Sequence, residues 1–233
     1  MSEIQKIYDG MWLDAIQHIK NDNYEIDNLI NSSKDTRRGV TVLSYLSDEI
    51  VVAISELSEK LKIIEPEQYY YPTHDFHLTV LSIITCVEGF KLSDIDVKEY
   101  SEAFEQALED IGPLKIHYSG VTASSSCILV QGFPDNDHLT ILRDKLRLSF
   151  KKFSLYTTID LRYEISTAHA TIVRFQSPLR DSEAFIQLLA KYRNIYFGTL
   201  EVNRLDFVFN NWYQNLLVTK QLSSRKLNPI KNT

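Results

Sequence analysis

One pattern occurs twice along the 233-residue chain: a short β-prone run, an amphipathic helix, and a strand that contains the residues His-x-Thr. The first copy begins its helix near Asp48 and reaches the strand motif at His77. The second begins its helix near His138 and reaches the motif at His169, after a nearly equal length of chain. An internal repeat of this kind predicts a duplicated α+β architecture.

The connections between the predicted strands favour antiparallel pairing. Strands alternate with helices, which leaves a parallel sheet open, but no glycine-rich loop follows any strand. Hairpin-like pairs over 114–131 and 198–222 indicate antiparallel sheets instead. Helices are expected at 2–20, 24–30, 48–63, 94–111, 134–153 and 181–193, and strands at 40–46, 76–84, 114–121, 127–131, 168–175, 198–209 and 213–222.

The sequence also predicts the domain organisation. Residues 1–38 are expected to form a helical N-terminal extension, followed by one domain over 39–222. The repeat divides that domain into lobes at about 39–112 and 113–222. Residues 223–233 are expected to be a frayed C-terminal tail.

The amino-acid composition limits the kinds of partner and of site that the protein can have. Lys and Arg number 25 against 31 Asp and Glu, so the net charge is −6, which opposes binding of long duplex nucleic acid. The two cysteines, Cys86 and Cys127, form no CxxC pair, which argues against a disulfide scaffold or a thiolate zinc site. With no secretory signal and no membrane-spanning apolar run, we expect a cytoplasmic protein without a membrane partner. The sequence leaves the oligomeric state open.

The two strand motifs carry the candidate chemistry. Side chains alternate along a strand, so His77 and Thr79 share one face, as do His169 and Thr171. If the apolar neighbours enter the core, two imidazoles and two hydroxyls line one cleft. One histidine can then take a proton from a nucleophile while the other gives a proton to a leaving oxygen. The threonine hydroxyls can hold phosphate oxygens.

A third His-x-Thr sequence, at His138 and Thr140, lacks this geometry. It opens a predicted helix, where residues i and i+2 point about 200° apart. We therefore assign His138 no role.

Two alternatives to a two-histidine enzyme stay open. His74, Asp75 and His77 could gather a metal ion in a metallophosphohydrolase. On a strand, however, His74 lies on the face opposite Asp75 and His77, which leaves few ligands together. Alternatively, the same cleft could recognise a nucleotide without turnover, with the N-terminal extension as a docking element for a partner.

The paired motifs His77-Leu78-Thr79-Val80 and His169-Ala170-Thr171-Ile172 resemble the signature of the 2H phosphoesterase superfamily, over about residues 40–222. This group includes 2′-5′ RNA ligase-like proteins and cyclic nucleotide phosphodiesterases. The resemblance implies an α+β bilobal fold in which two antiparallel sheets, related by a pseudo-twofold, surround a central cleft with helices outside. It also implies catalysis without a metal or another cofactor.

The resemblance further implies hydrolysis of a 2′,3′-cyclic phosphate or a 2′-5′ phosphodiester in a small nucleotide or an RNA end. Arg174 lies where bacterial members often carry an arginine, whereas Ser82 holds that place in the first motif. Aromatic residues supply further candidates for substrate binding: Tyr71, in the run Tyr69–Tyr71, and Tyr213, next to Trp212. The natural substrate and the acid and base roles of the two histidines remain open.

Overall fold

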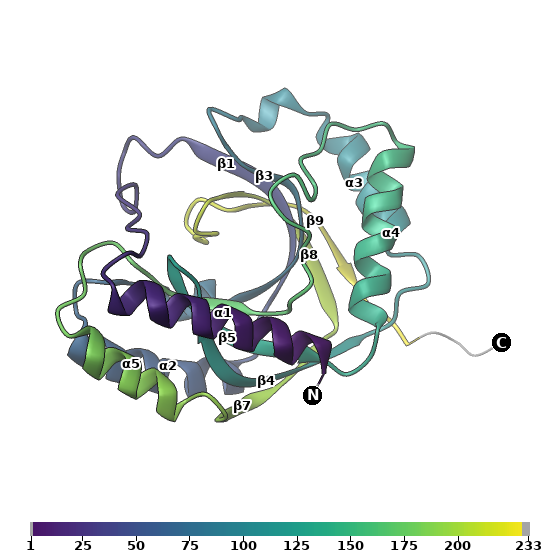
Figure 1. Ribbon diagram of the computed structural model, residues 1–233. Helices are drawn as coiled ribbons and strands as arrows, with labels where there is room; N and C mark the ends of the chain where they lie inside the picture. The colour runs from purple at the N-terminus through teal and green to yellow at the C-terminus, as the bar shows by residue number, and fades with distance from the viewer. Residues whose placement is uncertain (1, 230–233) are drawn as a thin grey trace.

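The computed structural model describes residues 2–229, which form two antiparallel sheets with five α-helices packed against them (Figure 1). Sheet A has the strand order β3-β1-β8-β9, and sheet B has the order β2-β6-β5-β4-β7. The strands are β1 (Arg37–Tyr45), β2 (Tyr69–Tyr70), β3 (His77–Glu88), β4 (Leu114–Ala123), β5 (Cys127–Pro134), β6 (Ala170–Arg174), β7 (Tyr196–Val202), β8 (Arg204–Asn211) and β9 (Lys220–Lys226). The prediction of antiparallel pairing is confirmed.

The helices divide between the two sheets (Figure 1). Helices α1, α2 and α5 pack with sheet B, while α3 and α4 pack together beside sheet A. Short 3-10 turns precede β3 at Thr73–Asp75 and follow it at Leu92–Asp94. The helices are α1 (Glu3–Lys20), α2 (Asp48–Ile64), α3 (Val97–Ala107), α4 (His138–Lys152) and α5 (Ser182–Lys191). None of the helices within residues 2–229 is both long and apolar enough to cross a membrane.

The sheets do not follow the expected lobes at 39–112 and 113–222. Strand β1 pairs with β3 on one edge and with β8 on the other, so sheet A contains strands from both halves of the chain. The short strand β2 leaves the first half to pair with β6 in sheet B. Strands that are hydrogen-bonded to each other are therefore often far apart in the sequence. Each sheet nevertheless holds one of the two motifs, in β3 and at the start of β6.

Several local predictions differ from the structure. The segment 24–30 forms no helix; the Tyr24 ring packs instead against Phe175, at 5.2 Å between centroids. The helix expected over 94–111 begins at Val97, because Asp96 caps it by accepting from the backbone N–H groups of Lys98 and Glu99.

The C-terminal strands are also placed differently. The strand expected over 198–209 is two strands, β7 and β8, which lie in different sheets. The strand expected over 213–222 begins only at Lys220, after a loop, and continues to Lys226. Residues 223–226 of the expected tail therefore belong to sheet A, and residues 230–233 lie outside the described part of the chain.

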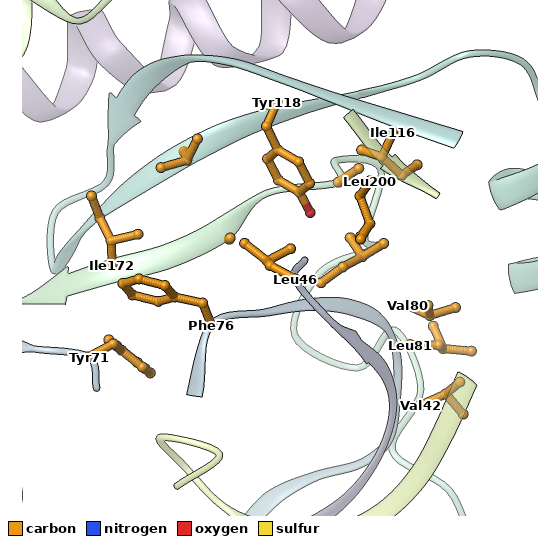
Figure 2. Packing of buried hydrophobic residues seen from close by; sticks show 14 of the residues in the cluster. Val42, Leu46, Tyr71, Phe76, Val80, Leu81, Ile116, Tyr118, Ile172 and Leu200 are labelled. Atoms are coloured by element: carbon orange, nitrogen blue, oxygen red, sulfur yellow. The ribbon is translucent and has the colours of Figure 1, made fainter. Parts of the chain in front are cut away.

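A continuous apolar core joins the two sheets (Figure 2). Val42 and Val80 of sheet A are fully buried, as are Ile116 and Tyr118 of sheet B. Helix α2 contributes the apolar stripe predicted from its sequence, all of it buried: Ile50, Ile54, Leu57 and Leu61. Burial of both sheets in one core fixes the relative position of β3 and β6.

Helix α1, in the expected N-terminal extension, packs on sheet B. Its Tyr8 and Ile19 are fully buried, and the Tyr8 ring lies edge-on to Phe133. Gly132 of β5 is needed beneath this helix, because a Cβ there would overlap the carbonyl group of Ala168. This close approach brings the segment before β6 against the sheet.

Candidate active site

Both strand motifs line one cavity of about 170 Å³ between the sheets. His77 and Thr79 come from β3; His169 directly precedes β6, and Thr171 lies within it. Their neighbours along the strands have no exposed surface: Leu78, Val80, Ala170 and Ile172. The predicted alternation therefore places both imidazoles and both hydroxyls at one cavity.

The surroundings of His77 fix which of its ring nitrogens faces the cavity. The side chain is 7% exposed, and Nδ1 lies 2.6 Å from the carbonyl oxygen of Asp75. A carbonyl only accepts hydrogen bonds, so Nδ1 carries the proton and Nε2 is left for proton transfer. The Asp75 carboxylate in turn accepts from the backbone N–H of Leu216, at 2.9 Å.

His169 has a different partner. Its Nδ1 lies 2.7 Å from the hydroxyl oxygen of Thr167, two residues earlier on the same face of the chain. A hydroxyl can either donate or accept, so this contact adapts to both protonation states of the ring.

Both histidines are neutral at neutral pH in the free protein. Burial, together with the nearby Arg174, lowers the pKa of His77 to about 4, although the Asp75 carbonyl opposes this shift. Burial also lowers the pKa of His169 to about 4, assisted by Arg143, His77 and Arg174. The cavity thus holds two neutral imidazoles beside positively charged arginine side chains.

Arg174 provides that charge at the cavity. Its Nε donates to the Tyr71 hydroxyl at 2.8 Å, and both side chains line the cavity. Burial raises the pKa of Tyr71, so the phenol stays protonated. Tyr71, which the sequence predicted as a substrate-binding residue, therefore orients the guanidinium group of Arg174 through its hydroxyl.

Tyr213 does not line the cavity. It is 5% exposed, and its hydroxyl donates to the Asp27 carboxylate at 2.9 Å and accepts from Arg37 at 2.7 Å. The neighbouring Trp212 lines the cavity instead. Trp212 therefore lies at the cavity, whereas Tyr213, the residue that the sequence predicted for substrate binding, points to Asp27 and Arg37.

Arg143, which the sequence did not single out, connects β3 with the segment just before β6. This α4 side chain is 3% exposed; its Nε donates to the Val80 carbonyl at 2.8 Å and its Nη2 to the Thr167 carbonyl at 2.6 Å. The sequence did offer a signal for this residue, because Arg143 lies between Leu142 and Leu146 on the apolar face of the helix.

Two further cavity residues were also missed. Gln214 follows β8 and donates through Nε2 to the Thr79 hydroxyl oxygen at 3.4 Å, which leaves the Thr79 proton free for another acceptor. Arg162 lies in the loop before β6. Both are in irregular segments, where strand or helix periodicity gives no signal.

The residues considered for a metal site do not converge. The His74 side chain is 55% exposed and its Nε2 lies 3.5 Å from Asp75, while Nδ1 of His77 contacts a backbone carbonyl. Within residues 2–229, no group of three or more His, Cys, Asp or Glu side chains is arranged to hold a metal ion. His138 is exposed at the first turn of α4 and does not line the cavity, as predicted from its helical position.

Comparison with known proteins identifies the fold. No protein-family model and no curated protein matches the sequence. Solved structures do match: TT0787 of Thermus thermophilus has a TM-score of 0.56 at 14% identity, over 81% of this chain and 97% of that one. A phosphoesterase matches with a TM-score of 0.56 at 11% identity, over 82% and 99%.

LigT of Escherichia coli, in its complex with 3′-AMP, matches with a TM-score of 0.51 at 14% identity, over 82% of this chain and 98% of LigT. Likeness at such identities shows the fold and leaves the chemistry to the site itself. The chain therefore has a LigT-like α+β fold, and this is the fold that the resemblance of its two motifs implied.

Proposed function

We propose that the chain is a metal-independent phosphoesterase that hydrolyses a 2′,3′-cyclic phosphate or a 2′-5′ phosphodiester in a small nucleotide or an RNA end. The observation that carries the proposal is the cavity lined by both histidines and both threonines. Structures of similar fold support the substrate class, since one is a phosphoesterase and LigT binds 3′-AMP and phosphate. Substrates are accordingly nucleotides or RNA ends, with no requirement for long duplex nucleic acid.

The two histidines take different parts in the proposed reaction. The Asp75 carbonyl accepts a hydrogen bond from His77 and so stabilises its protonated ring, which suits the general acid. His169 instead contacts a hydroxyl and lies near Arg143, which disfavours its protonated form and suits the general base.

In this reaction a water oxygen attacks phosphorus and His169 accepts the water proton. The bond from phosphorus to the ribose oxygen breaks, and His77 gives its proton to that oxygen, which leaves a phosphomonoester. Thr79 and Thr171 donate hydrogen bonds to the non-bridging oxygens, and Arg174 balances their charge.

The test is hydrolysis of 2′,3′-cyclic mononucleotides and 2′-5′ dinucleotides in the presence of EDTA. His77→Ala and His169→Ala should each lower kcat by about 10²–10⁴-fold, the usual range for loss of a general acid or base. His138→Ala is the matched control, because it removes an exposed histidine from the same His-x-Thr sequence and should keep full activity. Loss of wild-type activity in EDTA, or full activity in either cavity variant, would contradict the proposal.

One observation favours nucleotide binding without turnover as the second candidate. With both pKa values near 4, neither ring carries the proton of a general acid in the free protein at pH 7. Binding of a phosphate must therefore raise the pKa of His77 for the enzyme to work. A protein that binds 3′-AMP but hydrolyses none of the panel between pH 5 and 8 would be a binding module.

A further inference from the structure

A second cavity, of about 430 Å³, continues from the first. Both cavities are lined by His169, Arg174 and Trp212, and also by Arg162 of the loop before β6. The second one extends away from the reacting groups toward helix α1 and the turn Ser124–Ser126. A ligand at the two histidines therefore has room to continue in this direction.

Three guanidinium groups surround the indole ring of Trp212, which lies at the junction of the cavities. The distances to the ring centre are 5.1 Å for Arg37, 5.0 Å for Arg162 and 5.5 Å for Arg174. Such stacking holds a guanidinium group in place while its N–H groups remain available.

The three arginines differ in what balances their charge. Arg37 pairs with Asp27 at 3.3 Å and with Asp35 at 2.9 Å. Arg174 contacts the Tyr71 hydroxyl and lies beside the reacting groups, where it serves the phosphate being hydrolysed. Arg162 is exposed and forms no ion pair with any residue in the range 2–229.

The acidic neighbours of Arg162 along the chain are engaged elsewhere. Asp160 lines the first cavity and Glu164 the second, but their carboxylates lie 2.6 Å and 3.8 Å, respectively, from nitrogen atoms of Arg147. The loop is also anchored to β3, since the Thr158 N–H donates to the Ile83 carbonyl at 3.0 Å. The loop thus holds the Arg162 backbone near the cavity while leaving its charge uncompensated.

We propose that Arg162, stacked on Trp212, forms a subsite for a second phosphate group of the substrate. A cyclic phosphodiester carries one negative charge, which Arg174 balances, so a second phosphate would balance Arg162. The Ser124–Ser126 hydroxyls are further donors along the second cavity, whereas Glu25 lies at that end and accepts from Ser125 at 3.0 Å. The second phosphate therefore belongs at the Arg162 end.

This inference rests on the proposed function for the position of the reacting phosphate, and it narrows the substrate class. It favours an oligonucleotide end, or a dinucleotide that itself ends in a 2′,3′-cyclic phosphate, over a cyclic mononucleotide, because only the former two carry a phosphate beyond the reacting one.

The kinetic test compares adenosine 2′,3′-cyclic phosphate with the dinucleotide ApA that ends in a 2′,3′-cyclic phosphate. Arg162→Ala should raise KM for the dinucleotide about tenfold, the scale of a lost charge-assisted contact, and change KM for the mononucleotide less than twofold. Arg162→Lys should give a KM for the dinucleotide between those of the wild type and Arg162→Ala. Arg225→Ala is the control, since Arg225 is another exposed arginine, paired with Glu105 and lining neither cavity.

A binding test separates the subsite from catalysis. Calorimetry should show adenosine 3′,5′-bisphosphate binding about tenfold more tightly than adenosine 3′-monophosphate, with the difference removed by Arg162→Ala. If the protein shows this difference but cleaves no substrate, the subsite stands and the proposed hydrolysis fails. Equal binding of the two nucleotides, or equal effects of Arg162→Ala and Arg225→Ala, would overturn the subsite.

Discussion

The two cavity histidines are held by chemically different groups at Nδ1, a backbone carbonyl for His77 and the Thr167 hydroxyl for His169. A carbonyl fixes the position of the proton, whereas a hydroxyl can turn as the ring gains or loses a proton. The proposed roles of acid and base follow from this difference, which neither of the two sequence motifs contains.

Removing the Thr167 hydroxyl should impair His169 without removing it. Thr167→Val keeps the shape of the side chain but leaves Nδ1 without a partner, so both neutral forms of the ring become accessible. We expect kcat to fall about tenfold, less than in His169→Ala, and Thr167→Ser to restore most of it. The measurement is the pH profile of kcat for the three proteins; identical profiles would show that Thr167 does not position the ring.

The lowered histidine pKa values predict the pH dependence of the reaction. The proposed acid must be protonated, and with a pKa of about 4 its protonated fraction falls about tenfold for each pH unit above that value. We therefore expect kcat/KM to fall as pH rises from 5 to 8. The proposed reaction requires a bound phosphate to raise the pKa of His77, so kcat should peak at a higher pH than kcat/KM. Steady-state kinetics across this pH range test the prediction, and a rise of kcat/KM with pH would contradict it.

At the scale of elements, helix α1 supports the segment that leads into β6. The buried Tyr8 hydroxyl accepts from the backbone N–H groups of Gly132 and Ala168, each at 3.2 Å, and donates to the Gly132 carbonyl at 3.1 Å. Ala168 lies between Thr167 and His169. Helix α1 therefore helps to position His169, the proposed base, although the helix is far from this residue in the sequence.

Tyr8→Phe should destabilise the protein and affect its activity. The substitution leaves two buried N–H groups without a partner, which costs about 1–3 kcal/mol each before relaxation. Chemical denaturation should show the loss of stability, and Thr122→Val gives a comparison, since it removes a hydrogen bond to the Tyr8 carbonyl but leaves the Tyr8 hydroxyl in place. A Tyr8→Phe protein as stable as the wild type would contradict this account of the helix.

At the scale of the whole molecule, the two cavity histidines link stability to pH. Their pKa values are about 4 in the folded protein and near 6.5 in the unfolded chain, so the unfolded state binds more protons between these values. The free energy of unfolding should be independent of these groups above pH 6.5 and fall as pH drops from 6.5 toward 4. The slope is at most about 1.4 kcal/mol per pH unit for each histidine.

Denaturant titrations at several pH values check this prediction. A His77→Asn, His169→Asn double variant should lose much less stability over the same interval. The single exposed-site variant His138→Asn should keep the wild-type slope, and a slope shared by all three proteins would assign the pH effect to other groups.

The sequence predicted those parts of the fold and site that depend on neighbouring residues. Alternation along each strand placed His77 with Thr79 and His169 with Thr171, and helical spacing separated His138 from them. Contacts between distant segments were not predictable in this way. The pairing of β1 with β8, the bridge made by Arg143 and the stacking of Arg162 on Trp212 depend on how the sheets meet in space.

The strand order of sheet A bears on how the chain acquires its structure during synthesis. Strand β1 is made long before its partner β8, which begins only at Arg204. Until that point one edge of β1 has no neighbour, and the loop carrying Trp212 and Gln214 does not yet exist. The ribosome must therefore synthesise the chain beyond Gln214 before the cavity can close around its two imidazoles, so neither half of the duplicated sequence can form the cavity alone.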